Sequence, residues 1–112
     1  MKVITFYGAT GIGYGFQQAD TKADWFKQPG LAVFAAPDAY GWRVIRVVEL
    51  SGRDHDVRPL WALHDAERYG ADIVFVSNYT DAAERRIILG DIEAGLSPVL
   101  TGTGRNRLAL AA

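Results

Sequence analysis

The feature that most constrains the fold is a continuous apolar run in the late segment ADIVFVSN (71–78), which lies between two helical patterns. A short apolar run bounded by polar residues is typical of a buried strand. The segment 57–70 precedes it, with Asp56 as the expected N-cap and Gly70 as the expected stop. The segment 81–96 follows it as a second helix. A strand flanked by helices in this way predicts helices packed on a sheet.

The second helix has a clear apolar stripe. Either Thr80 or Asp81 is expected to cap its N-terminus. The stripe consists of Ile88, Ile92 and Leu96. We expect the core between this helix and the late strand to contain Ile73, Phe75, Ile88 and Ile92.

The first half of the chain adds three β-rich runs. MKVITFY predicts a strand over 2–7, and the runs LAVFAA (31–36) and WRVIRVVEL (42–50) predict an antiparallel hairpin joined by the turn PDAYG. The segment 18–30 predicts a short helix that a Pro-Gly pair ends. We therefore predict an α/β (α+β) fold, a small mixed sheet with a β-hairpin followed by α-β-α, with the helices packed on the sheet.

Length and composition limit the classes of protein. The 112 residues fit one domain, which we expect over 1–100 with a flexible tail over 101–112. A net charge of −1 argues against tight, charge-driven binding to nucleic acid or membrane, but leaves a local basic patch open. The lack of cysteine excludes disulfides and thiol catalysis. Because no secretory signal or long apolar stretch is present, we expect a cytoplasmic, bacterial-type protein without a membrane partner.

The stretch GATGIGYG (8–15) raises the question of a nucleotide-binding turn. The related fingerprint G-x-x-G-x-x-G would need a third glycine where Tyr14 stands, and the polar segment that follows is a poor Rossmann helix. We therefore expect a flexible surface loop and no cofactor, with three aromatic residues packed against the sheet: Tyr7, Tyr14 and Phe16. A nucleotide-dependent enzyme that uses this loop remains the alternative.

Polar and aromatic residues supply further candidates. His55 lies between two aspartates and suggests a base or metal ligand, although a solvated turn is the expected role. The three tryptophans suggest base stacking, although we expect most of them to pack in the core or at its edge. Arginines gather around the hairpin and the loop after it, at Arg43, Arg46, Arg53 and Arg58, where acidic neighbours dilute their charge. We expect anion binding at Arg43, Arg46 and Arg58.

Three segments together resemble GIY-YIG nuclease domains over about residues 29–100. PGLAVFAAPDAYGWRVIRVVEL is similar to the opening hairpin of that family, DVRPLWALHDAERYGADIVFVSN to its next helix and strand, and AAERRIILGDIEAGLSPVL to its final helix. The resemblance implies a nuclease site built from two strand tyrosines, an arginine and a metal-binding glutamate.

Most of these implied positions are substituted in this chain. The tyrosines fall on Ala32 and Arg46, and the glutamate falls near Ile88 or Leu89. The motif glycine falls on Val48 and the last asparagine on Thr101, whereas Arg58 matches the family arginine. Glu93, one turn beyond Leu89, is the candidate to replace the metal ligand.

The substitutions suggest a function without catalysis. We expect a catalytically degenerate, GIY-YIG-like binding or interaction module, whose partner is a protein or weakly bound nucleic acid. The alternatives are an active metal-dependent nuclease with a rearranged site, in which Arg58 and Glu93 are the catalytic candidates, and a homo-oligomer formed through an exposed hairpin edge.

Overall fold

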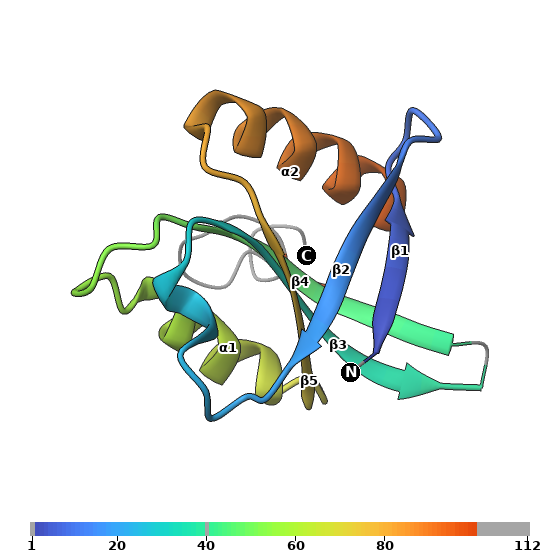
Figure 1. Ribbon diagram of the computed structural model, residues 1–112. Coiled ribbons are helices and arrows are strands. Elements are labelled where there is room, and N and C mark those ends of the chain that lie inside the picture. The colour runs from blue at the N-terminus through green and yellow to red at the C-terminus, as the bar shows by residue number, and fades with distance from the viewer. Residues whose placement is uncertain (1, 40, 101–112) are drawn as a thin grey trace.

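The computed structural model describes residues 2–39 and 41–100 (Figure 1). Its elements in chain order are β1 (Val3–Tyr7), β2 (Gly13–Ala19), η1 (Trp25–Lys27), β3 (Gly30–Asp38), β4 (Gly41–Leu50), α1 (Arg58–Glu67), β5 (Ile73–Asn78) and α2 (Ala82–Leu96). The predicted α+β class is confirmed. The predicted tail over 101–112 lies outside the described residues.

The five strands form one curled sheet in the order β1-β2-β5-β3-β4. Each pairing within the described residues is antiparallel, so the mixed sheet predicted from the sequence is wrong. β1 with β2, and β3 with β4, are hairpins of neighbouring strands. β5 lies between the two hairpins, pairing with β2 on one side and with β3 on the other. A strand from late in the chain thus joins the two early hairpins.

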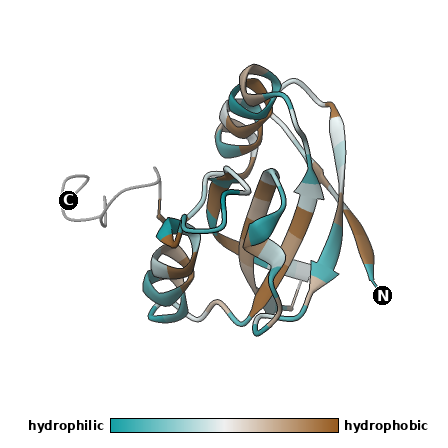
Figure 2. Ribbon diagram, turned by 60° about the vertical axis from the view of Figure 1, so that its left-hand side comes forward, coloured by the Kyte–Doolittle hydropathy of each residue, from teal (hydrophilic) through white to brown (hydrophobic). Residues whose placement is uncertain are grey.

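Helices cover both faces of the sheet. Successive residues of β3 point to opposite faces of the sheet. Every residue from Leu31 to Ala36 is nevertheless buried, so both faces of the strand are covered. Ala32 and Phe34 belong to the core under α1, whereas Leu31 and Val33 belong to the core under α2. Double coverage explains why LAVFAA is continuously apolar. In Figure 2 the hydrophobic colouring is accordingly strong along the strands between the two helices.

The glycine-rich stretch differs from the predicted loop. Residues 13–15 belong to β2, which runs on to Ala19 and occupies part of the segment predicted to be helical. Only the short 3₁₀ turn η1 remains of that helix. Phe16 is buried and Tyr14 is half-buried, as predicted, but Tyr7 points outward and is largely exposed.

The ends of the two helices show which of the predicted capping and stop residues act as expected. Asp81 caps α2, because its carboxylate accepts a hydrogen bond from the Ala83 amide at 3.0 Å. α1 begins one residue later than predicted, with Val57 rather than Asp56 at the N-cap position. Gly70 follows α1 with a φ of 101°, a left-handed conformation that favours glycine.

Candidate anion-binding cleft

A cleft of about 320 Å³ opens where the N-termini of both helices meet the end of β4. Its polar lining comes from three elements and the loop before α1. α1 lies on one face of the sheet and α2 on the other, and residues from the first turns of both helices line the cleft beside the edge strand β4. The charged lining residues are Glu49, Arg53, Arg58, Arg85 and Arg86.

Glu49 organises the α2 side of the cleft. Arg85 donates from Nε to Glu49 Oε2 at 3.0 Å, and Arg86 Nε lies 3.9 Å from Glu49 Oε1. The Arg85 side chain is buried and also donates to the carbonyls of Tyr79 and Thr80, at 3.1 and 3.0 Å. These bonds fix Arg85 as a structural cation. Arg86 remains largely exposed beside it.

Arg58 forms the α1 side through a bidentate ion pair with Asp56. Its Nε and Nη2 each donate to a carboxylate oxygen of Asp56 at 2.8 Å. Ser51 Oγ also donates to Asp56, at 2.7 Å, and the Arg58 amide donates at 3.1 Å. The Arg58 guanidinium, with help from Ser51, holds the pKa of Asp56 far below its ordinary value. The pair holds Arg58 in a fixed orientation at the rim.

The cleft carries an excess of positive charge. Four arginines face two carboxylates, those of Glu49 and Asp56. The guanidinium of Arg53 makes no ion pair or hydrogen bond to another residue in the described part of the chain. Arginine presents several donors in a planar fork that suits phosphate oxygens. The arrangement can therefore bind an anion by charge and by geometry.

The predicted anion-binding residues do not form one surface. Of the three, only Arg58 lines the cleft. Arg43 lies at the opposite end of α1, where its Nη2 donates to the Tyr69 carbonyl at 2.8 Å. Arg46 is fully buried under α1, with its Nη1 3.9 Å from Asp65 Oδ2.

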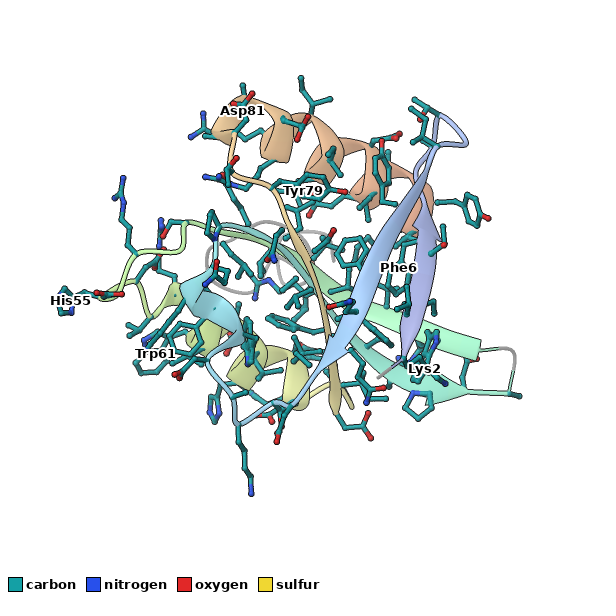
Figure 3. All side chains as sticks on the ribbon, viewed as in Figure 1. Lys2, Phe6, His55, Trp61, Tyr79 and Asp81 are labelled. Carbon is teal, nitrogen blue, oxygen red and sulfur yellow. The ribbon has the colours of Figure 1, made fainter. Side chains whose placement is uncertain are left out.

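The catalytic candidates are also separated. Glu93 lies about two turns beyond Arg86 along α2 and does not line the cleft that contains Arg58. His55 lies at the tip of the loop before α1, exposed and pointing away from the helix (Figure 3). Within residues 2–39 and 41–100, acidic and histidine side chains form no group of three that could hold a metal ion.

Asp91 of α2 holds the glycine-rich turn. Thr10 donates to its carboxylate from the amide at 2.9 Å and from Oγ1 at 2.7 Å, and Tyr14 Oη donates at 2.7 Å. The Ala9 amide donates to the Asp91 carbonyl at 3.0 Å. The amide of Thr10 is thus already engaged by a carboxylate of the same chain and is not open to a phosphate.

The close contact between the β1–β2 turn and α2 explains why glycine is required at two positions. A Cβ on Gly8 would overlap the Asp91 side chain, and one on Gly95 would lie 2.6 Å from the Ala9 amide nitrogen. Glycine at both positions lets the β1–β2 turn lie directly against the end of α2. The hydrogen bonds from Thr10 and Tyr14 lower the pKa of Asp91, and the bond to Asp91 raises the pKa of Tyr14.

Sequence reasoning missed Arg85, Arg86 and Asp91. In the pattern DAAERRIILGDI these three residues lie outside the predicted apolar stripe and were not singled out. One available signal was the pair of adjacent arginines in the first two turns. Lysine and arginine are normally favoured near the C-terminus of a helix rather than the N-terminus.

Comparison with protein-family models, with curated proteins and with solved structures finds no match for this chain. In the part of the chain that the structure describes, neither helix is long and apolar enough to span a membrane.

Proposed function

We propose that this protein is a binding module that holds phosphate groups of nucleic acid in the arginine cleft without cleaving them. The observation that carries the proposal is the cleft itself, where Arg53, Arg58 and Arg86 are exposed around Glu49. Phosphate contacts from arginine supply most of the affinity in sequence-independent nucleic-acid binding. The fold is proposed to be a degenerate relative of the GIY-YIG domain.

The chemistry of the implied positions favours binding over catalysis. Ala32 and Arg46, which stand where the resemblance places tyrosines, are both fully buried in the layer under α1. They cannot reach a substrate in the cleft. Glu49, the glutamate in the cleft lining, is already engaged by ion pairs with Arg85 and Arg86. Arginine alone attracts phosphate but does not activate water.

The test is fluorescence anisotropy with a labelled oligonucleotide at several salt concentrations. Binding should weaken as salt rises, because phosphate neutralisation releases counterions. Arg53→Ala and Arg58→Ala should each weaken binding and reduce the salt slope by about one. Arg68→Ala is the matched control, because Arg68 is an exposed arginine at the other end of α1.

Two results would overturn the proposal. One is binding that does not depend on salt or is absent at low salt. The other is an equal loss in Arg68→Ala and Arg58→Ala, which would indicate net charge rather than a site. Folding of each variant is checked by its thermal midpoint.

An active nuclease is the second candidate, since Glu49 places a carboxylate beside the cleft arginines. Incubation of labelled DNA and RNA with magnesium or manganese tests it. Cleavage that disappears in Arg58→Ala and in either Glu49→Gln or Glu93→Gln would replace the binding module by a metal-dependent nuclease.

A further inference from the structure

Trp61 differs from the other two tryptophans in its surroundings. Trp25 is 6% exposed and packs edge-on against Phe26 and Phe34, and Trp42 packs against Phe75 at 5.1 Å between ring centroids. Trp61 is 67% exposed. Its indole has no ring contact or hydrogen bond with another residue among those the structure describes.

The position of Trp61 places it beside the cleft. It lies on α1 three residues after Arg58, and side chains three apart on a helix are neighbours, with Cβ atoms about 5–6 Å apart. Arg58 lines the cleft, whereas Trp61 lies on the adjoining outer side of α1 (Figure 3). An open aromatic surface therefore adjoins a guanidinium at the rim.

Exposed indole beside arginines fits one kind of ligand. An unpaired base offers a flat apolar face to the indole, and the phosphate of the same strand offers charge to the arginines. In a duplex the base faces are stacked on each other, so a duplex offers phosphates but no free face along its length. An acidic strand with open bases complements both features at once.

We propose that Trp61 is a stacking platform for an unpaired base of single-stranded nucleic acid whose phosphates lie in the arginine cleft. This inference rests on the proposed function and narrows its ligand to single strands. The exposed apolar neighbours Val57 and Leu60 extend the same helix surface, and they provide an internal control.

The experiment compares three probes by anisotropy and competition: a short labelled oligothymidylate, a blunt-ended duplex of two separate strands, and inorganic polyphosphate. Trp61→Ala should weaken oligothymidylate binding about 5- to 150-fold, the range typical for loss of one stacked base. Trp61→Phe should retain most of the affinity, because a ring remains. Polyphosphate has no bases, so its binding should be the same in Trp61→Ala and the unmodified protein.

Leu60→Ala is the matched control, since it removes apolar area from the same helix without removing a ring. Equal losses in Leu60→Ala and Trp61→Ala would indicate that apolar area on this helix surface contributes rather than ring stacking, and would overturn the inference. Unchanged oligothymidylate binding in Trp61→Ala, or equal affinity for duplex and single strand, would also overturn it. If the unmodified protein fails to bind polyphosphate and both nucleic acids, the proposed function itself fails.

Discussion

The carboxylate of Asp91 fastens the β1–β2 hairpin to α2. It accepts hydrogen bonds from Thr10 and Tyr14, two residues that are far from it in sequence. A carboxylate that accepts several hydrogen bonds is favoured in its charged form, which is the cause of its lowered pKa. The residue therefore links the stability of the hairpin to pH.

We expect Asp91→Ala to lower the thermal midpoint at neutral pH. Because the folded-state pKa of Asp91 is lowered, its contribution is present above the ordinary value of 3.8 and is lost as pH falls through the folded-state pKa. The midpoints of the variant and the unmodified protein should therefore converge in acid. Thermal denaturation followed by circular dichroism across pH measures this. Asp54→Ala, an exposed aspartate in a loop, is the control, and a constant difference down to low pH would contradict the role of the charge.

Replacing either of the two glycines of α2 by alanine should change the free energy of unfolding, but in opposite directions. A Cβ on Gly95 would lie 2.6 Å from the backbone of Gly8 and Ala9, whereas one on Gly90 would meet nothing within 4 Å. Gly95→Ala should lower the free energy of unfolding by about 1–3 kcal/mol through overpacking. Gly90→Ala should raise it by about 0.5–1 kcal/mol, because alanine favours the helix. Urea denaturation measures both, and equal effects would mean that α2 does not touch the turn.

The elements could be predicted from sequence where apolar periodicity was strong. The runs in β3, β4 and β5 and the stripe of α2 gave their positions to within a few residues. β2 was missed because GYGFQQA has a single fully buried residue, Phe16, and its glycines read as a loop. Its strand conformation depends on pairing with β1 and β5, which local sequence does not encode.

At the scale of the molecule, two separate cores lie on the two faces of one sheet. Ile92 is fully buried in the core under α2, so Ile92→Ala should cost about 2–5 kcal/mol of unfolding free energy. Ile87, on the same helix, is 73% exposed, and Ile87→Ala should change the free energy of unfolding by no more than about 0.5 kcal/mol. Urea denaturation compares them. A loss under about 0.5 kcal/mol for Ile92→Ala would mean that α2 is not packed on the sheet.

The cleft was less predictable than the fold because it depends on tertiary arrangement. Arg58 was predicted as one of the arginines around the hairpin and the loop after it, and as the match to the arginine that the GIY-YIG resemblance implies. Arg85 and Arg86 join it only because α2 begins at the β4 edge, close to Glu49. Arg43 and Arg46 are close in sequence to residues that line the cleft, but both lie on β4 and their side chains contact α1 and the residues just after it instead. The sequence therefore showed where the arginines occur along the chain, but not which residues each arginine contacts in the folded protein.

The central place of β5 has a consequence for synthesis of the chain. The β1–β2 and β3–β4 hairpins can form locally as they leave the ribosome, but they cannot join until β5 has emerged. Until then the edges of β2 and β3 are open templates for strands of other chains. A nascent chain that ends before Ile73 would therefore contain two hairpins with unpaired strand edges and no complete sheet. The interval before β5 has emerged is therefore the one in which the chain is most exposed to aggregation.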